Sequence, residues 1–66
     1  MKVRINGREE IIDGEMTILS LLNSKGINPS MVVVEYNYEI PDKEKWDSIL
    51  INGGDNIEII KFIGGG

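Results

Sequence analysis

The stretch IEIIKFIGGG, residues 57–66, decides the fold class expected of this chain of 66 residues. Its first part, 57–63, predicts a strand, because β-branched and aromatic side chains dominate it and Ile57 and Ile59 alternate with a charged residue. Three glycines follow with no polar spacer, so the strand would fix the point at which a flexible tail begins. We therefore expect one folded domain at 1–63 and a glycine tail at 64–66.

The first dozen residues predict a β-hairpin. Val3 and Ile5 alternate with polar residues, and Asn6-Gly7 is the strongest short signal for a hairpin turn. A returning strand is expected at 10–12.

A single helix is expected at 18–25, where the apolar period changes from that of a strand to that of a helix. Thr17 suits the N-cap of this helix, and Gly26 suits the position just after its end. The residues expected on its buried face are Ile18, Leu21 and Leu22.

The second half of the chain predicts shorter elements. A third strand is expected at 32–36, a short edge strand at 40–41, a helical turn anchored by Trp46 at 42–46, and a turn at 52–55. This order of elements predicts an α+β fold, with one helix across one face of a mixed sheet of four to five strands.

The composition argues against most kinds of functional site. The chain has no cysteine and no histidine, so it lacks thiol nucleophiles and both the commonest general base and the commonest metal ligand. We therefore predict no catalytic residue and no metal site. The net charge of −4 disfavours nucleic acids and anionic membranes, and no apolar run approaches the roughly 20 residues that span a bilayer. We expect a cytoplasmic protein that is a monomer when free.

The glycine tail holds the one group with evident chemistry, the carboxylate of Gly66. A terminal carboxylate is an anion at neutral pH and a poor electrophile until it is activated. Gly64 and Gly65 have no side chains, so they can enter a narrow slot that leads to a partner's active site. A frayed end is the alternative, but the position directly after a strand favours a carrier.

Six segments, in this order, resemble the ThiS family, the sulfur carriers of thiamine biosynthesis within the ubiquitin-like group. They are NG at 6–7, TIL at 17–19, VVVEYN at 32–37, Pro41 followed by Trp46, GDNIEI at 54–59 and FIGGG at 62–66. The resemblance covers essentially the whole chain. It implies the β-grasp fold, in which the first and last strands lie side by side in the middle of the sheet.

The same resemblance implies a reaction sequence for the tail. An E1-like activating enzyme would adenylate Gly66, and sulfur from a persulfide donor would convert the adenylate into a thiocarboxylate. Thiazole synthase would then take the sulfur. ATP and magnesium would belong to the activating enzyme, and no cofactor is expected on this chain.

One segment departs from the family pattern. The family commonly has Asn-Gly after the third strand, whereas this chain has Asn37-Tyr38. Tyrosine adopts positive φ much less easily than glycine, so we expect a wider turn here.

A small apolar patch beside the tail is the predicted docking site for the activating enzyme. It comprises Val33, Ile60 and Phe62, which strand alternation places on the sheet face away from the helix.

Three other functions remain open. The molybdopterin synthase small subunit typically has Phe-Pro-Pro before its diglycine, where this chain has Lys61-Phe62-Ile63. A ubiquitin-like modifier would instead form isopeptide bonds with lysines. A plain interaction domain would have an incidental glycine tail.

Overall fold

Within residues 1–62, four strands, one α-helix and two short 3-10 helices form the fold. The computed structural model describes residues 1–62, so Ile63 and the predicted tail at 64–66 lie outside the described residues. The elements are β1 (Lys2–Ile5), β2 (Arg8–Ile11), α1 (Ile18–Ser24), η1 (Pro29–Met31), β3 (Val32–Tyr36), η2 (Lys43–Lys45) and β4 (Asn56–Lys61).

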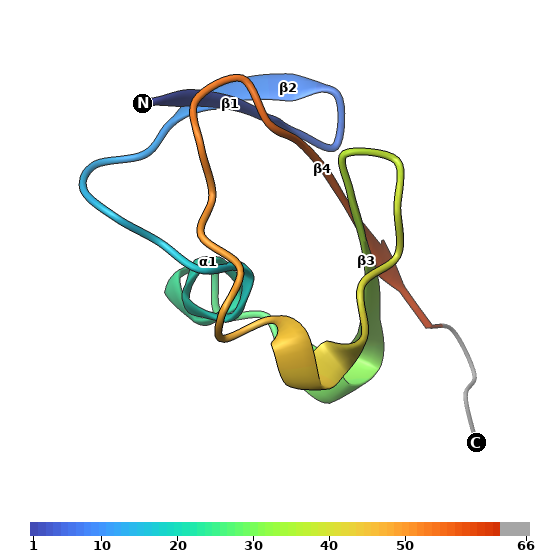
Figure 1. The fold of residues 1–66 in the computed structure, drawn as a ribbon. Helices are drawn as coiled ribbons and strands as arrows, with labels where there is room; N and C mark the ends of the chain where they lie inside the picture. Colours follow the sequence, from blue (N-terminus) through green and yellow to red (C-terminus); the bar gives the residue numbers. More distant parts are fainter. Residues whose placement is uncertain (63–66) are drawn as a thin grey trace.

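The sheet has the strand order β2-β1-β4-β3, with β1 and β4 parallel in its centre (Figure 1). In this central pair Arg4 lies opposite Asn56 and Ile5 opposite Ile57. The two outer pairs, β1 with β2 and β3 with β4, are antiparallel. The first and last strands are therefore neighbours, which confirms the β-grasp arrangement.

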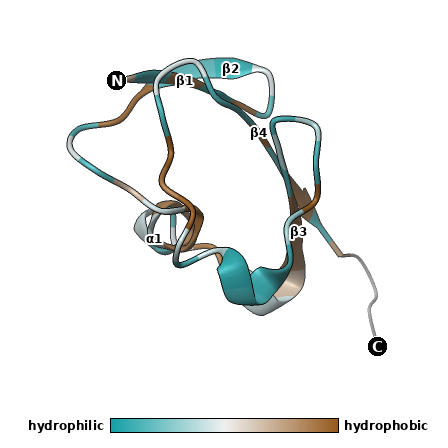
Figure 2. Ribbon diagram, viewed as in Figure 1, coloured by the Kyte–Doolittle hydropathy of each residue, from teal (hydrophilic) through white to brown (hydrophobic). Residues whose placement is uncertain are grey.

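The hydrophobic core lies between the sheet and the elements that cover one of its faces, α1 and the segment around η2 (Figure 1). Most of β3 is hydrophobic, whereas η2 is polar along its ribbon (Figure 2). Trp46 follows η2 and is only 2% exposed, so it anchors this turn in the core as predicted. The buried hydrophobic residues are Val3, Ile5, Ile12, Ile18, Leu21, Leu22, Val32, Val34, Trp46, Ile51 and Ile57. No helix within residues 1–62 is long and apolar enough to cross a membrane.

The ends of α1 follow the predicted chemistry. The Thr17 hydroxyl accepts from the Ser20 N–H at 3.1 Å, and the Ser20 hydroxyl accepts in return from the Thr17 N–H at 2.8 Å. This reciprocal pair satisfies two of the backbone donors that a helix start leaves free. The helix ends at Ser24, and Gly26 adopts φ +70°, a conformation that favours glycine.

Several predicted boundaries differ from the structure, including that of the helix, which ends at Ser24 and not at 25. The second strand begins earlier, at Arg8, because the tight Asn6-Gly7 turn lets pairing start at once, with Ile5 opposite Arg8. The last strand ends at Lys61 and not at 63. No strand forms at 40–41 within the described residues, since Pro41 lacks an N–H and pairing on that side is limited to one bridge between Tyr36 and Glu39.

The turn after β3 is tight, so our expectation of a wider turn is wrong. The Tyr36 N–H donates to the Glu39 carbonyl at 2.7 Å and the Glu39 N–H donates back at 3.1 Å, which encloses a loop of two residues. Asn37 and Tyr38 both have positive φ, 49° and 71°. Asn37 is held there from outside the turn, because its amide donates to Asp55 at 3.1 Å and accepts from the Asn56 N–H at 2.8 Å.

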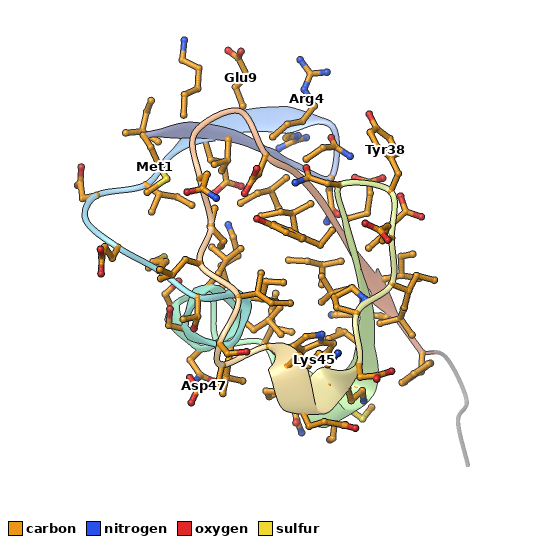
Figure 3. All side chains as sticks on the ribbon, viewed as in Figure 1. Met1, Arg4, Glu9, Tyr38, Lys45 and Asp47 are labelled. Carbon is orange, nitrogen blue, oxygen red and sulfur yellow. The ribbon has the colours of Figure 1, made fainter. Side chains whose placement is uncertain are left out.

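Tyr38 itself has little that favours its strained backbone. Its side chain is 79% exposed and projects from the molecule (Figure 3). The surrounding structure imposes this positive φ on Tyr38, and the backbone strain lowers the stability of the fold.

Replacing Tyr38 by glycine is therefore expected to stabilise the fold by roughly 0.5–1 kcal/mol, the relief of positive φ less the added entropy of the unfolded chain. Urea unfolding monitored through Trp46 fluorescence measures the difference. Tyr38→Ala is the matched control, because alanine removes the ring but keeps the Cβ penalty. Equal stabilisation by both variants would show that the ring, and not the backbone angle, is responsible.

Candidate functional site

The candidate site is the end of β4, from which the predicted tail continues. Phe62 is the last described residue, one position past the strand, and its N–H donates to the Met31 carbonyl at 2.9 Å. The predicted sulfur-carrying residue Gly66 and the access residues Gly64 and Gly65 lie outside the described part of the chain. Their roles remain predictions.

The structure brings two of the three predicted docking residues together. Val33 on β3 lies directly opposite Ile60 on β4, on the sheet face away from α1. Val33 is partly buried and Ile60 is 53% exposed. Phe62 is 45% exposed, and its ring lies near η2, with the Lys43 Nζ 5.4 Å from the ring centroid. The docking role of these residues also remains a prediction.

Charged residues fill much of the rest of this open face. Arg4 and Glu9 are cross-strand partners on β1 and β2 and project away from α1 (Figure 3). Glu35 and Glu58 lie directly opposite each other beside the Val33–Ile60 pair. Like charges in this position weaken strand pairing, so a cation on a partner protein would be favourable there.

A partly buried hydrogen-bond network centred on Asp55 lies beneath the turns at the opposite end of β4. Asp55 is 9% exposed, and its carboxylate accepts from the Tyr36 hydroxyl at 2.5 Å, the Asn52 N–H at 2.7 Å and the Asn37 amide at 3.1 Å. The sequence predicted only a turn at 52–55. The turn exists, since the Asp55 N–H donates to the Asn52 carbonyl, but the structural role of the carboxylate was missed. The available signal was an Asp three positions after Asn52 within a predicted turn, where a short carboxylate can accept from a nearby backbone N–H.

This network shifts two pKa values in opposite directions. The pKa of Tyr36 is raised from 10.0 to about 12, chiefly by burial and further by the hydrogen bond to Asp55 and the negative charge of that carboxylate. Burial also opposes ionisation of Asp55, but the hydrogen bonds from Tyr36, Asn52 and Asn37 outweigh it and lower the pKa of Asp55 below 3.8. With its oxygens satisfied, the carboxylate ties β3 to the start of β4 and is poorly suited to act as a base.

The described residues offer little for metal binding. Within 1–62, no three acidic side chains come together as a metal ion would require. Within residues 1–62, the candidate site is therefore the surface beside the end of β4.

The network predicts a pH dependence of stability with a defined sign. The Tyr36 contribution is present below pH 10.0, the ordinary pKa, and is lost as the pH rises toward 12. The Asp55 contribution is present above pH 3.8 and is lost as the pH falls through the lowered folded-state pKa. Tyr36→Phe should remove the alkaline loss, as measured by urea unfolding across this range. The control Tyr38→Phe should retain it, and identical alkaline profiles for both variants would contradict this assignment.

Comparisons with known proteins agree with this geometry. The model of the ThiS family matches residues 3–66. The "Sulfur carrier protein ThiS" of Bacillus subtilis is 42% identical over 50 residues, covering 76% of each chain. A "Thiazole synthase" of Paramagnetospirillum magneticum is 42% identical over 66 residues; the whole chain is matched, but it spans only 20% of that relative's length.

A solved structure gives the same result for the fold. The crystal structure of the thiamine biosynthesis protein ThiS from Geobacter metallireducens superposes with a TM-score of 0.86 at 30% identity, with all of both chains covered. Family match and shared fold extend over nearly the full length, and the chain therefore belongs to the ThiS family.

Proposed function

We propose that this chain is a sulfur carrier of thiamine biosynthesis and that it carries sulfur as a thiocarboxylate on Gly66. The main support is that the family match runs through residue 66, so the glycine tail belongs to the matched segment. The Bacillus subtilis relative, which bears the name of a sulfur carrier, adds to this support.

The proposed chemistry begins with activation of the carboxylate. A carboxylate oxygen of Gly66 attacks the α-phosphorus of ATP on an E1-like enzyme, and pyrophosphate leaves. The resulting acyl adenylate is a mixed anhydride with AMP as a good leaving group. ATP and magnesium are bound by that enzyme, where the metal neutralises phosphate charge.

Sulfur transfer then requires thiols that this chain does not have. The terminal sulfur of a persulfide displaces AMP and forms an acyl disulfide. A second thiol cleaves the S–S bond, supplies two electrons and releases the thiocarboxylate. The chain contains no cysteine, so both thiols come from partner proteins or small molecules.

The fold contributes position rather than reactivity. β4 lies between β1 and β3: it pairs with β1 at its start, at Asn56 and Ile57, and with β3 from Ile57 to its end at Lys61. The bond from the Phe62 N–H to Met31 extends this restraint one residue past the strand. The tail thus starts from a fixed point, and its glycines allow the approach to a narrow active site.

The proposed acceptor of the sulfur is a thiazole synthase. In the Paramagnetospirillum magneticum relative, a segment similar to this whole chain belongs to a longer protein named thiazole synthase. Joining a carrier-like segment to a synthase raises the effective concentration of the carrier at the synthase, and this favours sulfur delivery.

The activating enzyme is proposed to dock on Val33, Ile60 and Phe62. The Val33–Ile60 pair is apolar, accessible and close to the end of β4. The neighbouring Glu35 and Glu58 favour a partner whose surface presents Lys or Arg around an apolar centre.

Intact mass measurement tests the carrier function. Incubation with ATP, magnesium, the activating enzyme and a persulfide donor is expected to raise the mass by the difference between one sulfur and one oxygen atom. A chain lacking Gly65 and Gly66 should show no change, because its carboxylate cannot reach the activating site. An unchanged mass of the full chain would contradict the proposal, and isopeptide adducts on lysines would indicate a modifier instead.

Substitution of Ile60 tests the docking surface. Ile60→Asp should lower adenylation by roughly tenfold or more, because a charge would be buried in an apolar contact. Ile11→Asp is the matched control: Ile11 is an isoleucine of the same sheet, 69% exposed, but it lies on β2 at the far edge. Pyrophosphate release measures both variants after circular dichroism has shown that they are folded. Equal rates of pyrophosphate release for the two variants would contradict a docking role for Ile60.

A further inference from the structure

The side chain of Lys43 lies between two aromatic rings from distant parts of the chain. Its Nζ is 5.7 Å from the centroid of the Trp46 ring and 5.4 Å from that of Phe62. Both distances are within the ~6 Å over which an ammonium group is attracted to a ring face. Within residues 1–62 the only ion pair joins Lys25 to Glu10, so Lys43 has these rings and no carboxylate as its close partners.

The two rings differ in how firmly they are held. Trp46 is 2% exposed and belongs to the core, so its position is fixed by packing. Phe62 is 45% exposed and follows the last residue of β4. Its backbone N–H is held by a hydrogen bond to Met31, which leaves the direction of the ring to other contacts. Lys43 therefore links a fixed element to the end of the described chain.

We propose that Lys43 is a positioning residue for the glycine tail: by holding the Phe62 ring against η2, it sets the direction in which the chain leaves the sheet. This inference rests on the proposed carrier function, because the direction matters only if the tail must enter an activating enzyme. Gly64, Gly65 and Gly66 have no side chains with which to set their own course. Phe62 is the last side chain whose contacts the structure describes.

The contact is separable from the stability of η2. The turn is closed by backbone bonds, from the Lys45 N–H to Asp42 at 3.0 Å and from the Trp46 N–H to Lys43 at 3.1 Å. Burial of Trp46 anchors it independently of charge. Replacing the Lys43 side chain therefore leaves the turn in place while it removes the link to Phe62.

The kinetic test uses three variants and the complete chain. Lys43→Met removes the charge but keeps an unbranched side chain. Lys43→Arg keeps a cation that can lie over both rings. Lys45→Met is the control, because Lys45, labelled in Figure 3, belongs to the same turn. For adenylation of the carrier, we expect Lys43→Met to lower kcat by roughly two- to fivefold, the size of one exposed cation–π contact. KM should change less than kcat, because the Val33–Ile60 pair of the proposed docking surface is untouched. Lys43→Arg should restore kcat, and Lys45→Met should match the wild-type chain.

A second measurement tests the contact without any enzyme. In NMR spectra of the free chain, the side-chain methylene protons of Lys43 should be shifted upfield by the two rings. Phe62→Leu should reduce this shift, while Lys45 signals stay unchanged.

The outcomes separate this inference from the proposed function. Adenylation of the wild-type chain with an unchanged kcat for Lys43→Met would overturn the positioning role alone. Lys43 signals that do not respond to Phe62→Leu would overturn the contact itself. Absence of any adenylation of the wild-type chain would overturn the carrier function, and the positioning role with it.

Discussion

The parallel pairing of β1 with β4 is the constraint on which the rest of the structure depends. The Arg4 N–H donates to the Asp55 carbonyl and the Asn6 N–H donates to the Ile57 carbonyl, both at 2.9 Å. The Asn6 side chain continues this ladder past the end of β1 by accepting from the Ile59 N–H at 2.7 Å. Parallel neighbours require a long crossover, and here it contains every other described element, from β2 to η2. The last strand is thereby held in the sheet centre, and the chain leaves it from a defined place.

Asp55 provides the second long-range constraint. It explains why Tyr38 adopts a positive φ, which tyrosine disfavours. Its carboxylate is reached from Tyr36, Asn37 and the Asn52 backbone, so the β3 turn and the entry to β4 form one bonded unit. A network whose buried carboxylate is fully hydrogen-bonded favours a single geometry. The strained backbone of Tyr38 is tolerated because this network fixes the neighbouring residues. The strain lies at the end of the sheet far from Phe62 and has no evident part in sulfur transfer.

Local pattern predicted the elements well, and it could not predict which of them meet. Thr17, Gly26 and the third strand follow rules that act within a few residues, and the structure confirms them. The narrow turn at Tyr38 depends on Asp55, which is 17 positions away in the sequence. The residues next to the turn therefore give no indication of this interaction. The Lys43–Phe62 contact has the same character. For the candidate site, alternation predicted the Val33–Ile60 pair, whereas the ring direction of Phe62 required the fold.

The central claim is that the end of this chain carries sulfur to a thiazole, and transfer of a radioactive sulfur atom tests it most directly. The chain would be loaded with labelled sulfur by the activating enzyme, purified, and mixed with thiazole synthase and its other substrates. Chromatography of the small molecules and of the protein would then locate the label. We expect the label to leave the chain and to appear in a thiazole product. Label that stays on the loaded chain, with no thiazole formed, would contradict it.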